Sequence, residues 1–187
     1  MRATLGLGLA VAVGMMGCLS ETPQQMRTRM DRESAALRQT LDGFARSYER
    51  WVAAGQADSI AGLYMEQGRQ LPPNEPAAVG RAAIRDREAR LARWGAWTLR
   101  VIPEALVANG PLAVERGSFA ITLKPGPNAP PGMPAVADTG KYLAHWHEVN
   151  GQWRFAELIW NSNRSPTPPR AAPKTSPKSP RSRQRSR

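Results

Sequence analysis

Glu157 is the side chain in this sequence whose surroundings best suit acid–base chemistry. It follows Asn150-Gly151, a favoured two-residue hairpin turn, and a hairpin in that register pairs it with Ala144. Its carboxyl group then shares a face of the sheet with Trp146 and Phe155. Burial beside aromatic rings raises the pKa of a carboxyl group, which suits a general acid or base. Glu157 is therefore the catalytic candidate. The alternative is a structural glutamate held by a helix arginine or a tyrosine hydroxyl.

His145 and His147 form a second group with chemical potential, because side chains two residues apart in a strand share a face. Two imidazoles can bind a metal ion, but no third ligand accompanies them, and Arg154 lies opposite His147 in the predicted register. We therefore expect no metal site and no cofactor. The single cysteine, Cys18, cannot form an internal disulfide bond.

Aromatic residues spread along the chain form a third group. We expect them to line an apolar pocket for a small aromatic or lipid-like ligand, together with one asparagine from the last strand; core packing is the alternative use. The candidate ligand-binding residues are Tyr48, Trp51, Tyr64, Trp97, Trp146, Trp160 and Asn161.

The elements that position these residues follow from hydrophobic periodicity. Apolar residues from Leu37 to Trp51 recur at spacings of three and four, which predicts an amphipathic helix. Two shorter helices follow, and alternating patterns around Asn109-Gly110 and Asn150-Gly151 predict two hairpins. The predicted helices cover about residues 34–54, 57–64 and 80–93, and the predicted strands cover 97–101, 106–107, 112–123, 141–149 and 153–161. This order predicts an α+β domain, with three helices packed on one face of a curved antiparallel sheet.

In the predicted register, both faces of the hairpin around Asn150-Gly151 carry apolar side chains. Because helices cover only one face of such a sheet, the other face is available to a partner. We therefore expect a homodimer.

The first 17 residues are expected to be a signal peptide. The apolar run from Leu5 to Met16 is too short for a membrane-spanning helix, which needs about 20 residues. The sequence Met15-Met16-Gly17-Cys18 resembles a bacterial lipobox, which implies cleavage before Cys18 and lipid attachment to its thiol. The polar residues 18–33 are then expected to form a tether.

The residue after the cysteine, Leu19, implies sorting to the outer membrane of a Gram-negative cell, on the side that faces the periplasm. Localisation in the bacterial cell envelope is therefore expected, with a soluble secreted or periplasmic protein as the alternative.

Most of the net charge of +11 belongs to the C-terminal tail. Residues 164–187 contain eight Lys or Arg and no acid, which leaves 18 basic and 15 acidic side chains elsewhere. The tail is rich in Pro and Ser and has no large apolar residue, so we expect it to be disordered. A solvated tail without a partner is the base expectation. Behind an export signal, anionic lipid headgroups or envelope polymers are the alternative partners, and nucleic acid is not expected.

Residues 40–163 resemble the SnoaL-like family known as domain of unknown function 4440, which belongs to the nuclear transport factor 2-like superfamily. The matching segments are Trp51 with Gly55-Gln56-Ala57-Asp58, Leu63-Tyr64, Leu71-Pro72-Pro73, Val79-Gly80-Arg81 with Ile84, Gly140-Lys141-Tyr142-Leu143, Trp146, Gly151, Trp153-Arg154 and Trp160-Asn161-Ser162-Asn163. The resemblance implies a cone-shaped domain over residues 34–163, commonly dimeric, with a pocket between the helices and the sheet.

The superfamily includes ketosteroid isomerase, polyketide cyclases and dehydratases, as well as binding modules without catalysis, so the fold does not give the function. In the isomerase branch a catalytic carboxylate sits on the strand after the second helix, where this chain has no acid between Gly68 and Pro73. We therefore expect a lipid-anchored, non-catalytic module that binds a small apolar ligand or mediates dimerisation. The alternative is an isomerase, cyclase or dehydratase that uses Glu157.

Overall fold

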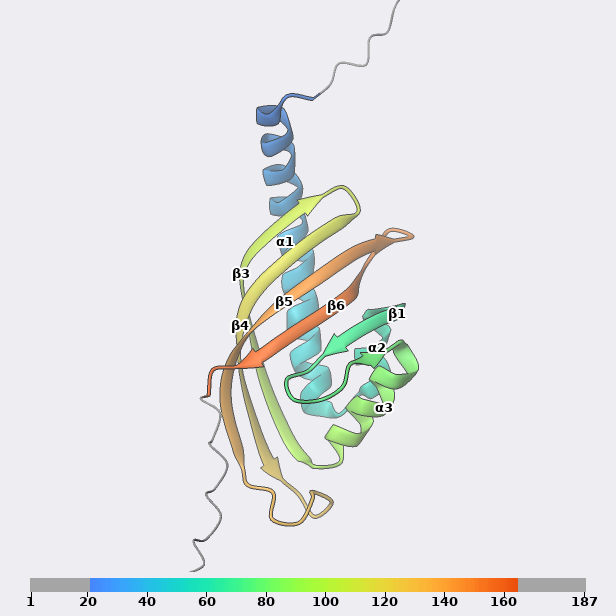
Figure 1. Ribbon diagram of the computed structural model, residues 1–187, viewed down its shortest axis with the longest axis vertical. Coiled ribbons are helices and arrows are strands. Elements are labelled where there is room, and N and C mark those ends of the chain that lie inside the picture. Colours follow the sequence, from blue (N-terminus) through green and yellow to red (C-terminus); the bar gives the residue numbers. More distant parts are fainter. Residues whose placement is uncertain (1–20, 165–187) are drawn as a thin grey trace, which may run out of the picture.

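Helices and strands alternate in the first part of the domain, and long strands make up the rest (Figure 1). The computed structural model describes residues 21–164. Its elements, in chain order, are α1 (Pro23–Ala54), α2 (Ala57–Gly62), β1 (Tyr64–Leu71), β2 (Ala78–Val79), α3 (Arg81–Ala92), β3 (Gly95–Asn109), β4 (Leu112–Pro125), β5 (Val136–Val149) and β6 (Gln152–Ser162).

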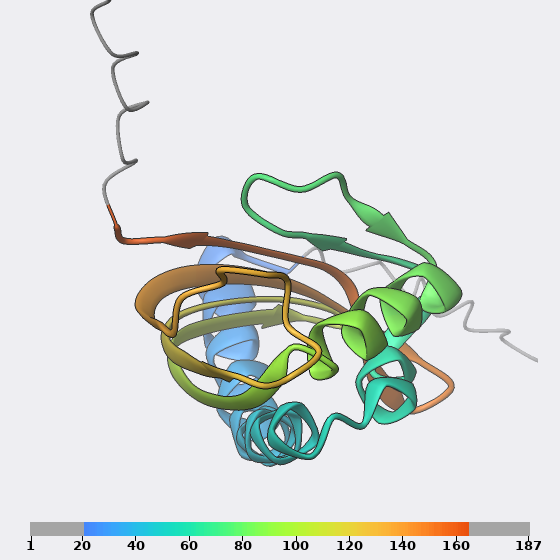
Figure 2. The ribbon, with the colours of Figure 1, turned by 90° about the horizontal axis from the view of Figure 1, so that it is seen from below.

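The six strands form one sheet in the order β2-β1-β6-β5-β4-β3. Figure 2 shows the long strands curling toward the side on which the helices lie, and Figure 1 shows β3, β4 and β5 crossing in front of α1. The predicted α+β class, with three helices on a curved sheet, is confirmed. One pairing differs from the predicted antiparallel arrangement, because β1 runs parallel to β6. No hairpin joins these two strands, so their direction is not set by a tight turn.

Helix α1 begins at Pro23, eleven residues before the predicted start at Ser34. Thr22 and Gln25 form a reciprocal capping box there, and Pro23 occupies the first helical position, where a missing N–H costs nothing. The added turns also contact the turn between β3 and β4, since Glu33 accepts a hydrogen bond from the Gly110 amide at 2.9 Å. The predicted tether of residues 18–33 is therefore helical from Pro23 onward.

The hairpin between β5 and β6 turns at Asn150-Gly151, and Trp146 pairs with Phe155, both as predicted. Ala156 then forms a bulge, so that His145, rather than Ala144, pairs with Glu157. Beyond the bulge every side chain of β6 lies on the face opposite to the predicted one, because the side-chain period of a strand is two residues.

The hairpin between β3 and β4 differs from the prediction by one residue. Asn109 pairs with Leu112, so the turn residues are Gly110 and Pro111 instead of Asn109 and Gly110. Strand β5 also begins earlier than expected, at Val136, and it pairs with β4 from Val136 to His147.

Three predictions concern residues that lie outside the described range. These are the signal peptide over residues 1–17, the lipidated Cys18, and the basic tail beyond Arg164. Within residues 21–164, no helix has the combination of length and hydropathy needed to cross a membrane.

Candidate functional site

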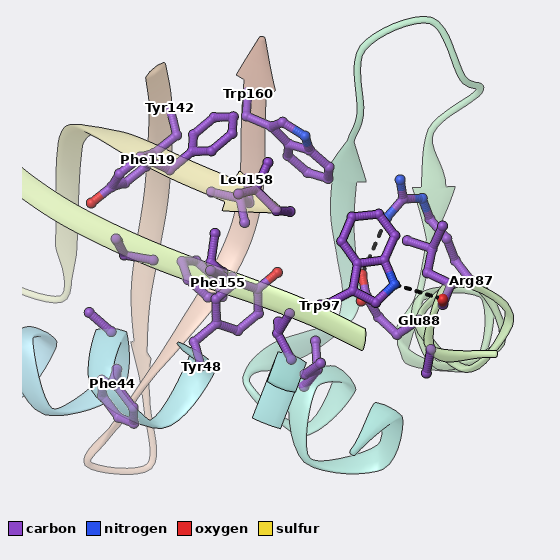
Figure 3. A pocket seen from close by; sticks show the side chains of 18 of the residues that line it. Phe44, Tyr48, Arg87, Glu88, Trp97, Phe119, Tyr142, Phe155, Leu158 and Trp160 are labelled. Carbon is purple, nitrogen blue, oxygen red and sulfur yellow. Dashed lines mark hydrogen bonds and ion pairs between the residues drawn. The ribbon is translucent and has the colours of Figure 1, made fainter. Parts of the chain in front are cut away.

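A pocket of about 300 Å³ lies between the helices and the inner face of the sheet (Figure 3). Helix α1 contributes Phe44 and Tyr48, helix α3 contributes Arg87 and Glu88, and the remaining wall comes mainly from β3 to β6. The lining is predominantly apolar and aromatic, with a few polar groups, which is the usual composition of a site for small molecules.

Trp146 forms the centre of the aromatic wall and is only 2% exposed. Its ring stacks on Phe155 with centroids 3.8 Å apart, and Phe44 stacks at 5.9 Å. These three rings come from β5, β6 and α1, so the wall joins the helix layer to the sheet. A rigid apolar surface of this kind favours a flat or ring-shaped ligand.

Two glycines of the sheet leave room for aromatic rings. A Cβ atom at Gly117 would lie 2.7 Å from the Tyr142 ring, and one at Gly140 would lie 2.3 Å from the Phe119 ring. Both distances are far below van der Waals contact, so only glycine permits these rings to lie across the strands. Tyr142 and Phe119 both line the pocket as a result.

A charge cluster in which Arg87 and Glu88 are largely buried stands at one side of the pocket (Figure 3). The guanidinium group of Arg87 bonds to Glu75 at 3.0 Å and to Glu88 at 3.3 Å, and it lies 5.4 Å from the Trp160 ring centroid. The Glu88 carboxylate also accepts a hydrogen bond from Gln70 at 2.9 Å. Burial raises the pKa of Glu88, and these hydrogen bonds oppose the rise.

A second polar group lies on the sheet, where Glu115 of β4 is 5% exposed. The Tyr142 hydroxyl donates a hydrogen bond to Glu115 Oε1 at 2.8 Å. Burial raises the pKa of Glu115, while the bond from Tyr142 lowers it. Figure 3 shows Tyr142 and the Arg87–Glu88 cluster at opposite sides of the pocket, with Phe155 and Leu158 between them.

Neither of these two carboxyl groups was predicted from the sequence, although each has a positional signal. Glu88 lies one helical turn after the buried Ile84, on the same helix face. Glu115 lies two residues after the buried Ala113, on the same strand face.

Four of the predicted ligand-binding residues line the pocket: Tyr48, Trp97, Trp146 and Trp160. The other three do not. Tyr64 is fully buried in the core and accepts a hydrogen bond from Gln70, and Trp51 packs against that core. Asn161 is exposed on β6.

Glu157 lies on the outer face of the sheet, and the prediction that it lies beside Trp146 is wrong. The bulge at Ala156 turns its side chain outward, where it is 45% exposed and 3.7 Å from Arg69. Leu158 takes the inward position instead and lines the pocket. Glu157 therefore lacks the apolar surroundings that made it a candidate acid or base.

His145 and His147 share the outer face, as predicted, with their Nε2 atoms 3.1 Å apart. Burial lowers the pKa of His147, and the neighbouring His145 adds to this effect. Among the described residues, no group of three or more His, Cys, Asp or Glu side chains is arranged to hold a metal ion.

No protein-family model and no curated protein matches this sequence. Similarity appears at the level of structure. A nuclear transport factor 2-like superfamily protein from Salmonella enterica superposes with a TM-score of 0.60 at 14% identity, covering 74% of this chain and 99% of that one.

Two further solved structures are similar at comparable levels. A hexachlorocyclohexane dehydrochlorinase from Novosphingobium barchaimii has a TM-score of 0.58 at 14% identity, covering 72% of this chain and 91% of its own. A ketosteroid isomerase-like protein from Erwinia carotovora has a TM-score of 0.56 at 15% identity, covering 66% and 94%. These likenesses, together with the helix order and the curved sheet, show that the chain has the fold of the nuclear transport factor 2-like superfamily.

Proposed function

We propose that the domain binds a small, predominantly apolar ligand in the pocket between its helices and its sheet, without transforming it. The observation that carries this proposal is the stacked wall of Phe44, Trp146 and Phe155 around a cavity of about 300 Å³. Cavities of this size and composition match small-molecule sites in other proteins.

Filling the pocket from the sheet side is expected to weaken ligand binding. Leu158→Trp places a larger ring in the cavity, and we expect it to weaken the binding of the neutral fluorescent probe N-phenyl-1-naphthylamine by about tenfold or more. Asn161→Trp is the matched control, because Asn161 is exposed on the same strand, on the face opposite to Leu158. Equal probe affinity in both variants, measured by fluorescence titration, would show that the probe binds elsewhere.

Acid–base catalysis is the alternative function, and its candidate residues are now other than Glu157. The isomerase, cyclase or dehydratase mechanism was assigned to Glu157, which lies outside the pocket, whereas Glu88 and Glu115 line it. Burial raises the pKa of both groups, as suits a general acid. An activity abolished by Glu88→Gln or Glu115→Gln, with ligand affinity retained, would favour this alternative.

We also propose that the outer face of the sheet packs against a second copy of the chain. Ile102, Val114, Leu143 and Ile159 are exposed there on four adjacent strands. Charges of both signs flank them, including the Arg69–Glu157 pair, and a two-fold interface needs such self-complementary charge. Leu143→Arg is expected to convert a dimer into a monomer in sedimentation velocity; a wild-type monomer would contradict the proposal.

Export to the cell envelope and lipid attachment at Cys18 complete the proposed function, and they rest on the sequence alone. Because stable anchoring needs more than one acyl chain, Cys18→Ser is expected to move the protein from the detergent phase to the aqueous phase. Membrane association that persists in this variant would exclude the anchor.

A further inference from the structure

Two histidines of β5 lie side by side on the outer face of the sheet. The Nε2 atoms of His145 and His147 are 3.1 Å apart, and we call these two residues the histidine pair. Both side chains are half-buried, so a small solute reaches them from solvent. They are the only two histidines in the sequence. Any binding through imidazole nitrogens in this protein therefore belongs to the histidine pair.

The spacing of the two nitrogens suits a chelated metal ion. Zinc–nitrogen bonds of about 2.0–2.1 Å at the tetrahedral angle place two ligand nitrogens about 3.3–3.4 Å apart. The observed 3.1 Å differs from this spacing by about 0.2–0.3 Å. In a neutral pair one nitrogen donates a proton to the other, and a metal ion can take the place of that proton.

A carboxylate behind the first imidazole favours the binding tautomer. Glu157 Oε2 lies 3.9 Å from Nδ1 of His145. A negative charge on this side stabilises the proton on Nδ1, so the lone pair of Nε2 stays free beside His147. Metal-binding histidines in proteins are commonly held in this way by a carboxylate on the far side of the ring.

Arg154 is the positive group closest to the histidine pair in the register, because it pairs with His147 across β5 and β6. The sequence predicted that its charge would oppose a metal ion. In the structure its guanidinium group donates hydrogen bonds to the Gly62 carbonyl and to the Gln152 side chain. Two oxygens of the chain therefore already share this charge.

The histidine pair is only half of a structural metal site. A structural zinc ion is almost always held by four ligands, and the pair supplies two. Within residues 21–164, no group of three or more His, Cys, Asp or Glu side chains is arranged to hold a metal ion. The other two ligands must therefore come from elsewhere.

The position of the histidine pair indicates where they come from. On β4, Val114 pairs with His145 and Leu112 pairs with His147, and Leu143 precedes the pair on β5. All three apolar side chains are exposed. The pair thus lies within the apolar outer face that we propose to pack against a second copy. A two-fold axis through such a patch places the same residues of the two copies opposite each other.

We propose that two copies of the chain, packed through their outer faces, hold one divalent transition-metal ion between their two histidine pairs. This inference rests on the proposed dimer and adds a metal site to it. Four neutral imidazoles are a ligand set that suits Zn²⁺, Cu²⁺ or Ni²⁺, whereas Mg²⁺ prefers oxygen ligands.

Sedimentation velocity of the full-length chain, in EDTA and in excess ZnCl₂, tests the shared site. Because the ion binds only the associated state fully, we expect Zn²⁺ to tighten dimer formation by about tenfold or more, and MgCl₂ to have no effect. Equilibrium dialysis should give one zinc ion per two chains. Bound Co²⁺ should show the strong visible absorption of a tetrahedral ion, not the weak absorption of the hydrated ion.

The double variant His145→Gln with His147→Gln should lose zinc binding and the effect of zinc on association, and should retain the association seen in EDTA. Lys141→Gln is the matched control, because Lys141 is exposed on the same face of the same strand. It should respond to Zn²⁺ as the wild-type chain does. Circular dichroism melting curves verify that each variant is folded.

The outcomes separate this inference from the proposed dimer. A chain that is dimeric in EDTA but binds no Zn²⁺ would overturn the metal site and leave the dimer standing. One zinc ion per chain, or zinc binding that survives in the double variant, would also overturn the shared site. A chain that stays monomeric with and without Zn²⁺ would contradict the proposed dimer itself.

Discussion

Replacing Trp146 with alanine is expected to lower the free energy of unfolding by about 3–5 kcal/mol, the usual range for a buried aromatic residue. The side chain is almost fully buried and stacks on both Phe155 and Phe44, so its removal opens a cavity where α1 meets the sheet. The same substitution removes the centre of the pocket wall. The binding of N-phenyl-1-naphthylamine should therefore weaken as well. Urea denaturation followed by circular dichroism measures the first effect.

Val149→Ala on the same strand is the control for Trp146→Ala. Val149 is exposed at the end of β5, and surface substitutions of this kind change stability by about 0.5 kcal/mol or less. If both variants unfolded at the same urea concentration, Trp146 would not belong to the core described here.

Replacing Arg87 with methionine is expected to cost about 3–5 kcal/mol as well, for an electrostatic reason. Arg87 is only 9% exposed and bonds to both Glu75 and Glu88. Without the guanidinium group, the buried Glu88 carboxylate keeps only its hydrogen bond from Gln70. A buried charge without a partner costs much more stability than a buried ion pair. The loss of stability in Arg87→Met therefore exceeds the loss caused by breaking a surface ion pair.

The loss caused by Arg87→Met should depend on pH. Burial already holds the pKa of Glu88 above its ordinary value of 4.5, and removal of Arg87 raises it further. A group whose pKa is higher in the folded state stabilises the fold when it is protonated. The free-energy cost of its charged form therefore appears as the pH rises through the folded-state pKa. The deficit should therefore be large at pH 7 to 8 and shrink as the pH falls toward the ordinary glutamate range.

Arg85→Met provides the control, because Arg85 lies on the same helix, is exposed, and pairs with the exposed Asp86. It should change stability by about 0.5 kcal/mol or less at every pH. A deficit in Arg87→Met no larger than this, or one that grew toward acid pH, would contradict the assigned role of the Arg87–Glu88 pair.

The helical face of α1 was predictable because Leu37 and Leu41 follow the helical period and are buried. Its first turns were not, since residues 23–33 are largely polar and their helicity depends on the capping box at Thr22 and on contacts with the β3–β4 turn. Hydrophobic periodicity detects the buried face of a helix, but it gives no signal where caps and polar contacts stabilise the helix.

The face on which Glu157 lies could not be predicted from alternation alone. After the bulge, one face of β6 carries Leu158 and Trp160 and the other carries Ile159, so either register places an apolar residue inward. The bulge at Ala156 decides between them, and it has no glycine to mark it in the sequence. The turn at Asn150-Gly151 correctly set the register only as far as Trp146 and Phe155.

The aromatic part of the site was predictable from composition, whereas its polar part was not. Tyr48, Trp97, Trp146 and Trp160 reach the pocket from four separate elements. The Tyr142 hydroxyl is bonded to Glu115 across Gly117, and no local sequence pattern reveals this contact between neighbouring strands.

The indole N–H signals of the six tryptophans in a nitrogen–proton NMR spectrum test the central claim most directly. Trp94, Trp97, Trp146 and Trp160 line the pocket, whereas Trp51 and Trp153 pack against the core outside it. On titration with 2-acetylnaphthalene, we predict that the signals of the first four shift and that those of Trp51 and Trp153 stay in place. An unchanged spectrum at saturating ligand, or shifts confined to Trp51 and Trp153, would contradict a ligand-binding pocket between the helices and the sheet.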